Sequence, residues 1–142
     1  MTGFKFYSKP KIKRPEAALQ RTVVEYLRFT GVPGMIYFSV PNDAKRSVVM
    51  GAELKRMGMR AGAADLCVIV SGRVHFLELK SAKGKQSLEQ KAFEADANEA
   101  GCNYVVANNI VAALTALASW GAIRVALMPR QQSEQDAARA AA

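Results

Sequence analysis

The sequence has little cysteine and only one histidine. Cys67 lies inside an apolar run, and Cys102 follows an expected helix end. Two cysteines in these places form neither a disulfide framework nor the spacing of a zinc site. We therefore expect both to be reduced thiols of a cytoplasmic protein.

Long apolar runs are also missing. No run approaches the roughly 18 residues of a membrane-spanning helix, and no apolar signal region follows the basic N-terminal stretch. The length of 142 residues and the hydrophobic content of 50% suit one compact domain that can build a core. These features predict a soluble, unsecreted protein with no membrane partner.

Acidic residues are in deficit, because 12 Asp and Glu stand against 20 Lys and Arg, for a formal net charge of +8. This balance favours nucleic acid as a partner, although many basic proteins are merely soluble. Five of the cations lie in residues 1–14, which contain no acidic residue. We expect this segment to be a flexible basic arm, either a solubilising tail or a DNA contact, while residues 129–142 form a flexible tail after a domain over 15–128.

The pattern of apolar residues predicts alternating helices and strands. Their order indicates an α/β fold with a mixed central sheet flanked by helices. Helices are predicted from Pro15 to Gly31, over 45–57, from Ser87 to Gly101 and from Asn108 or Asn109 to Gly121; strands are predicted over 35–40, 66–70, 74–80 and 104–107, with an extra strand over 123–128.

A tight hairpin brings two carboxylates together. The apolar run 66–70 is typical of a strand buried on both faces, and Ser71-Gly72 marks the turn. If the turn is centred between these two residues, paired residues have numbers that sum to 143, so Asp65 lies opposite Glu78. Opposed residues share a sheet face, with Cβ atoms roughly 4.5–5.5 Å apart, so we expect a cation between the two carboxylates. Lys80 shares this face because it lies two residues beyond Glu78.

Asp65, Glu78 and Lys80, here called the carboxylate–lysine trio, fit metal-assisted hydrolysis. Mg²⁺ prefers one or two carboxylates with waters and phosphate oxygens, and the ammonium can reach the water or the attacked phosphate. A one-residue slip in the turn would break this arrangement, and such residues are also common surface features. The lone His75 pairs with Val68 on the other face, so we expect a structural role for it.

Three segments follow one another in the sequence: Gly-Met-Arg-Ala-Gly-Ala-Ala-Asp-Leu at 58–66, Glu-Leu-Lys at 78–80 and Gly-Lys-Gln-Ser-Leu-Glu-Gln at 84–90. In this order they resemble the viral-type replication-repair nuclease (VRR-NUC) family of the PD-(D/E)XK nuclease superfamily, and the resemblance covers about residues 16–125. Ala64 stands where the family motif has proline. The resemblance implies a restriction-endonuclease-like αβββαβ core, Mg²⁺- or Mn²⁺-dependent DNA cleavage, and catalytic positions for the carboxylate–lysine trio.

The resemblance also assigns three supporting residues. Glu16 matches an acidic residue that helps to hold metal in the family, and Gln90 matches a glutamine in the helix after the catalytic strand. Asn42 lies in a segment near the family's site, although Asp43 replaces the usual glutamate. Two of these residues have structural alternatives, since Gln90 can form a capping box with Ser87 and the helix dipole favours Glu16 at a helix start.

Four further cations are candidate contacts to DNA phosphates, with solvated side chains as the alternative: Lys55, Arg60, Lys83 and Lys85. Small family members resemble Holliday-junction resolvases, so we expect a homodimer acting on branched DNA in replication, repair or recombination. Two other functions stay open, a non-catalytic module that binds DNA junctions and an RNA-directed nuclease of the same superfamily.

Overall fold

The computed structural model describes residues 15–41 and 47–124. The predicted arm 1–14, Asn42 and the tail 129–142 therefore lie outside the described residues. Four helices and four strands are present in the described part: α1 (Pro15–Thr30), β1 (Ile36–Ser39), α2 (Val48–Arg56), β2 (Leu66–Val70), β3 (Arg73–Leu79), α3 (Leu88–Glu99), β4 (Asn103–Ala107) and α4 (Ile110–Ser119).

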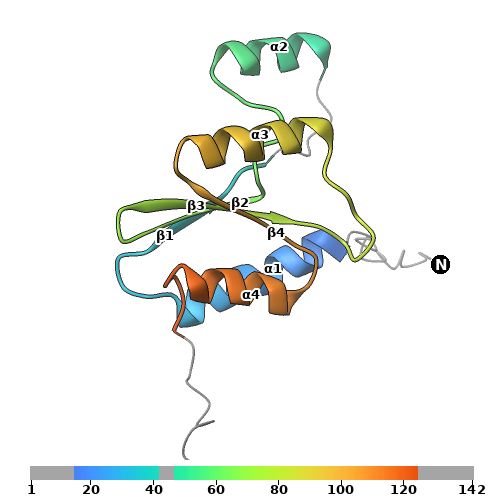
Figure 1. The fold of residues 1–142 in the computed structure, drawn as a ribbon. Helices are drawn as coiled ribbons and strands as arrows, with labels where there is room; N and C mark the ends of the chain where they lie inside the picture. The colour runs from blue at the N-terminus through green and yellow to red at the C-terminus, as the bar shows by residue number, and fades with distance from the viewer. Residues whose placement is uncertain (1–14, 42–46, 125–142) are drawn as a thin grey trace, which may run out of the picture.

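The four strands form one mixed sheet in the order β1-β2-β3-β4. The pairs β1–β2 and β2–β3 are antiparallel, whereas β3 and β4 are parallel and are joined through α3. Helices α1 and α4 cover one face of the sheet, and α3 covers the other, with α2 beyond it (Figure 1). This arrangement confirms the predicted α/β class and the predicted order of elements.

The hairpin between β2 and β3 has the predicted register. Leu66 pairs with Leu77 and Val70 with Arg73. Ser71 and Gly72 both have positive φ angles, of 51° and 72°. Two central residues of this kind make the primed turn whose twist matches that of paired strands, and such a turn fixes the register. Continued by one residue, this register places Asp65, directly before β2, opposite Glu78 of β3.

The two faces of the sheet are packed unequally. The larger cluster of buried residues lies between the sheet and helices α1 and α4, and consists of Val23, Leu27, Leu66, Val68, Val70, Leu77, Leu79, Ala107, Ala113, Ala116, Leu117, Ala122 and Ile123. The smaller cluster, towards α3, contains Ala64, Ala97 and Tyr104 with Phe76, Phe93 and Cys102 packed against them. Burial of apolar side chains is the main driving force for folding, and the larger cluster provides most of it. The face towards α3 can therefore hold polar residues.

Two predicted elements differ from the structure at their ends. The helix predicted over 45–57 begins at Val48, because the Ser47 side chain accepts a hydrogen bond from Met50 N–H at 3.2 Å and caps it there. Only the start of the extra strand predicted over 123–128 is described, and there Ile123 forms a single antiparallel bridge with Gly31. None of the described helices is long and apolar enough to cross a membrane.

Candidate active site

The carboxylate–lysine trio gathers at one end of the sheet. Asp65 directly precedes β2, and Lys80 directly follows β3. The Lys80 ammonium lies 3.0 Å from Oε1 of Glu78, and Oδ2 of Asp65 accepts a hydrogen bond of 2.7 Å from Leu79 N–H. The Glu78 side chain is 1% exposed and that of Lys80 is 12% exposed. The hairpin thus brings together the three residues on which the sequence prediction depends.

The environment of Glu78 disfavours its charge. Burial, and then the nearby charge of Asp65, raise the pKa of Glu78 from 4.5 to about 7, while the hydrogen bond and charge of Lys80 act in the opposite direction. Removing a carboxylate from water costs free energy, and a second carboxylate on the same face adds repulsion. The site therefore favours a further positive charge beside Glu78.

Gln90 links the start of α3 to the buried carboxylate. Its Nε2 donates a hydrogen bond of 2.6 Å to Oε1 of Glu78. Its Oε1 accepts from Ser87 N–H at 2.8 Å, while its own N–H donates to Ser87 Oγ at 3.2 Å. The same side chain therefore completes the capping box through its Oε1 and contacts Glu78 through its Nε2, while its role in catalysis stays a prediction. Capping of α3 thereby fixes the direction of the bond to Glu78.

The two carboxylate oxygens of Glu78 have different surroundings. Oε1 contacts both Lys80 and Gln90, whereas the buried Oε2 has no hydrogen-bond partner among the residues that the structure describes. An unpaired buried carboxylate oxygen is costly, and a bound cation removes that cost. Asp65 lies on the same face, so the pair can supply oxygen ligands to one divalent ion.

No group of three or more histidine, cysteine, aspartate or glutamate side chains in residues 15–41 and 47–124 is placed to hold a metal ion. Two carboxylates completed by waters and substrate phosphate are nevertheless the arrangement that Mg²⁺ uses in enzymes that act on phosphates. The residues present therefore fit an ion of this kind better than a zinc or calcium site enclosed by protein ligands.

Glu16 reaches the same end of the sheet from the first turn of α1. Its Oε1 accepts a hydrogen bond of 3.2 Å from the backbone N–H of Ser81, the residue after Lys80. Gly84 lies close by, and a Cβ atom built there would be 3.2 Å from Glu16 Oε1. Glu16 thus ties α1 to the loop after β3, and its metal-binding role stays a prediction.

His75 lies on the opposite face, as the register predicted. Its ring stacks on Trp120 with centroids 4.6 Å apart, and Nδ1 lies within 2.9 Å of the Asn103 side-chain amide nitrogen. Burial, and then the charge of Arg73, lower the pKa of His75. The stacking and the polar contact support a structural role for His75, on the face of the sheet opposite to the carboxylates.

The predicted DNA contacts are dispersed around the site. Lys83 and Lys85 are exposed in the loop between β3 and α3, and Lys55 is exposed on α2. The Arg60 guanidinium forms an ion pair with Asp96 on α3. It also lies over the Phe93 ring, 5.2 Å from the centroid. All four DNA-binding roles stay predictions, and Arg60 has an additional intramolecular role that the sequence did not reveal.

A close backbone approach explains one glycine in the motif before Asp65. Gly62 has a φ angle of 78°, and a Cβ atom there would collide with the backbone of Glu89 and Gln90. Only glycine combines this conformation with so close a contact. The loop before β2 therefore packs directly on the first turn of α3, which holds Asp65 and Gln90 at the same site.

Tyr104 is a neighbour of the site that the sequence prediction missed. It lies on β4 and pairs with Phe76 of β3, and burial, followed by the charge of Glu78, raises the pKa of its hydroxyl. The parallel pairing of β3 and β4 places this residue near Glu78. No spacing within the sequence reveals that pairing.

Comparison with known proteins identifies the fold. No family model matches the sequence, and no curated protein matches it. Among solved structures, one described as a VRR_NUC domain protein is similar with a TM-score of 0.62 and 20% identity, over 78% of this chain and 96% of the other. A second, described as a VRR_NUC domain, has a TM-score of 0.50 and 19% identity, over 73% and 94% of the two chains. The chain therefore has the fold of a VRR-NUC domain.

Proposed function

We propose that this protein is a metal-dependent nuclease that hydrolyses DNA phosphodiester bonds at the carboxylate–lysine trio. The observation that carries the proposal is the buried Glu78, whose Oε2 has no hydrogen-bond partner among the described residues, beside Asp65 and Lys80. A structural carboxylate would be paired on both oxygens, whereas a metal ligand needs one that is not. The VRR-NUC fold and the motif resemblance support the same reaction class.

Asp65 and Glu78 would hold the ion, Mg²⁺ or Mn²⁺. When bound, such an ion lowers the pKa of a water and polarises the attacked phosphate. Gln90 fixes the Glu78 carboxylate through its 2.6 Å hydrogen bond. Lys80 keeps an ammonium at the carboxylate, where it orients the attacking water and offsets the negative charge that develops on the phosphate.

The finer parts of the proposal concern the substrate and the assembly. The net charge of +8 and the exposed lysines at 83 and 85, close to the end of β3, support contact with phosphates. We infer that DNA is the substrate and that Glu16 contributes to ion binding. Small members of the VRR-NUC family resemble Holliday-junction resolvases, and we therefore infer branched DNA and a homodimer, which would place two sites on two strands.

A cleavage panel tests this function. Labelled linear DNA, branched DNA and RNA are incubated with and without Mg²⁺, using wild type, Asp65→Asn, Glu78→Gln and Lys80→Ala. We expect Mg²⁺-dependent cleavage of DNA by wild type alone. Binding to junctions without cleavage at any Mg²⁺ or Mn²⁺ concentration would instead indicate a non-catalytic module, and preferential cleavage of RNA would indicate an RNA-directed nuclease.

A further inference from the structure

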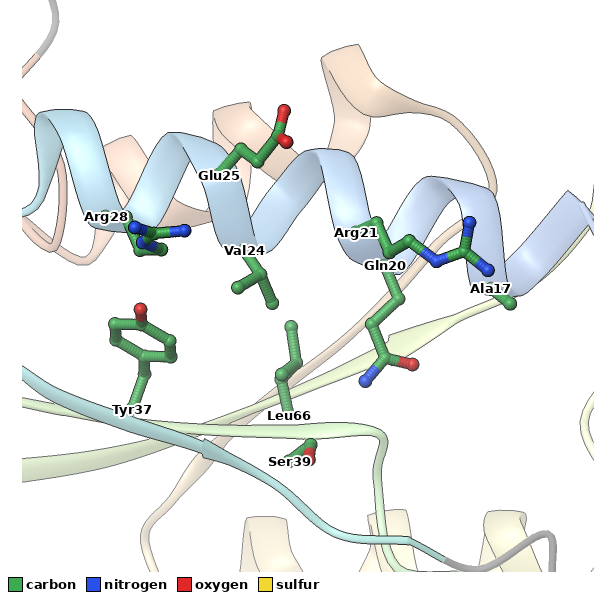
Figure 2. Close-up of a pocket in the computed structure, with 9 residues that line it drawn as sticks. All are labelled: Ala17, Gln20, Arg21, Val24, Glu25, Arg28, Tyr37, Ser39 and Leu66. Carbon is green, nitrogen blue, oxygen red and sulfur yellow. The ribbon is translucent and has the colours of Figure 1, made fainter.

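A second feature of the molecule lies on the other side of the sheet. A hollow of about 520 Å³ runs between α1 and the edge strand β1 (Figure 2). Its surface is mostly apolar and carries polar and charged side chains at its rim, and none of its residues belongs to the carboxylate–lysine trio. The lining residues are Ala17, Gln20, Arg21, Val24, Glu25, Arg28, Tyr37, Ser39 and Leu66.

One side of the hollow is a stripe of α1. Ala17, Arg21, Val24 and Arg28 are spaced by four, three and four residues, which is the repeat of one helix face. Both arginines are exposed. Seven residues of helix separate them, or about 10 Å along the axis at 1.5 Å per residue. The stripe therefore presents two cations in a row along the rim of the hollow.

The other side of the hollow is formed by the sheet. Tyr37 and Ser39 alternate along β1 and so share a face, and Leu66 of β2 pairs with Ser39. In Figure 2 the Tyr37 hydroxyl is turned towards Arg28 on the helix, while the Glu25 carboxylate is turned away from the sheet. The lining thus combines an aromatic ring, a hydroxyl and an apolar floor with two arginines.

The hollow begins at the catalytic end of the sheet. Ala17 follows Glu16, whose carboxylate accepts a hydrogen bond from Ser81, next to Lys80. On the sheet side, Leu66 follows Asp65, and the carbonyl of Asp65 accepts a hydrogen bond of 3.0 Å from Val40 N–H, beyond the end of β1. A chain bound along α1 would therefore run from the carboxylates towards Arg28.

We propose that this hollow binds a short single-stranded segment of the nucleic-acid substrate next to the scissile bond. The proposal rests on the proposed nuclease function and adds the substrate class, namely DNA with an unpaired segment beside the cut. Arginines placed along a backbone and an aromatic face for a base are the features of sites for single strands. A volume of about 520 Å³ is that of a small-ligand pocket. A duplex, whose major groove alone is about 12 Å wide, is too large for it.

Binding measurements in the presence of a chelator test the proposal without any cleavage. The probes are a fluorescent oligothymidine, a blunt duplex and the same duplex with a single-stranded overhang. We expect Arg21→Ala/Arg28→Ala to weaken binding of the oligothymidine and of the overhang duplex by about tenfold or more, with blunt-duplex binding within about twofold of wild type. The slope of log affinity against log salt for oligothymidine should shrink by about 1.4, at roughly 0.7 per phosphate contact.

A matched control is Arg124→Ala. Arg124 is exposed and lies beyond the end of α4, where it lines a different hollow, between α1 and α4. It should leave all three affinities within about twofold of wild type. Equal losses on the blunt duplex and the overhang duplex, or equal losses from Arg124→Ala, would show general electrostatic attraction and would overturn the proposal.

Variants of Tyr37 separate stacking from fold stability. Tyr37→Phe keeps the ring and should bind oligothymidine nearly as wild type does, whereas Tyr37→Ala should bind it about tenfold more weakly. Circular dichroism verifies that both variants fold. Wild-type affinity of a folded Tyr37→Ala protein would contradict the assignment of a base-stacking face. Because every readout is binding, loss of cleavage in the trio variants has no bearing on the result.

Discussion

Strand β3 carries two buried ionisable side chains, His75 and Glu78, on opposite faces of the sheet, and their surroundings differ. His75 stacks on Trp120 and lies within hydrogen-bonding distance of Asn103, inside the well-packed layer towards α1 and α4. Glu78 shares its face with another carboxylate, and among the described residues its Oε2 has no hydrogen-bond partner. The His75 ring thus has a polar neighbour in the folded protein, whereas Oε2 of Glu78 can still accept a contact from a ligand.

This difference shows how a buried polar residue can be assigned to structure or to chemistry. A polar group held for stability gains from complete pairing, because unpaired buried groups cost free energy. In a site that binds an ion, the ion-free protein has an unpaired polar group and is less stable for that reason. The comparison predicts that changes on one face affect mainly stability and that changes on the other affect mainly activity.

The largest contrast should come from two adjacent residues, Leu77 and Glu78, which face opposite sides. Glu78→Gln removes the charge that would bind the ion, so cleavage should fall by about a hundredfold or more while the fold persists. Leu77→Ala leaves a cavity in the main core and should cost about 2–5 kcal/mol of unfolding free energy. Cleavage rates and urea denaturation measure the two effects.

The control for this contrast is the rate of Leu77→Ala per folded molecule, which should stay close to that of wild type. A folded Glu78→Gln protein with near-normal turnover would remove Glu78 from the active site. A Leu77→Ala protein with an unchanged free energy of unfolding would show that Leu77 does not belong to the main core.

A second prediction separates the two roles of Gln90. Ser87→Ala removes the side-chain cap of α3 but keeps the bond from Gln90 to Glu78, so it should cost about 1 kcal/mol of stability and little activity. Gln90→Ala removes both contacts and should in addition lower the cleavage rate by about tenfold, as expected of a residue that positions a ligand. Equal rates for the two variants would leave Gln90 with only a capping function.

The sequence was sufficient to predict the hairpin because its turn is local. Ser71 and Gly72 set the register, and the register sets which residues share a face, so the positions of Asp65, Glu78, Lys80 and His75 all followed from one turn. The predicted order of helices and strands was confirmed as well, because the apolar periods are strong. Residues that are close together in the sequence therefore determine the hairpin register and the order of elements.

Features that depend on distant pairings could not be predicted in the same way. Tyr104 approaches Glu78 only because β4 runs parallel to β3, and Glu16 meets Ser81 across 65 residues of sequence. The hollow beside β1 requires that α1 packs on that particular side of the sheet. The spacing of residues along the sequence does not indicate such contacts, so only the structure reveals them.

A smaller effect is expected for His75. Its position on the main core face predicts that His75→Ala loses the stacking contact with Trp120 and destabilises the protein, while the cleavage rate at saturating substrate stays within a few-fold of wild type. Thermal denaturation and single-turnover cleavage measure the two quantities. A rate loss beyond about a hundredfold, the scale of general acid–base catalysis, would contradict the assignment of His75 to structure.

A final expected effect is a pH dependence of stability in the absence of divalent ions. The pKa of Glu78 is about 7 in the folded protein against 4.5 as its ordinary value, so the folded state binds this proton more tightly. Its contribution to stability is therefore fully present below about pH 4.5 and is lost as the pH rises through about 7. Urea denaturation across this range should show a decline that Glu78→Gln lacks. Parallel profiles for both proteins would show that Glu78 ionises normally.

Direct measurement of Mn²⁺ binding by electron paramagnetic resonance, at about pH 8 and without DNA, is the sharpest test of the account. Wild type and His75→Ala should bind the ion with the same affinity, whereas Glu78→Gln and Asp65→Asn should bind it at least about tenfold more weakly. Wild-type affinity in both carboxylate variants would contradict the claim that the end of the sheet beside α3 is a metal-dependent active site.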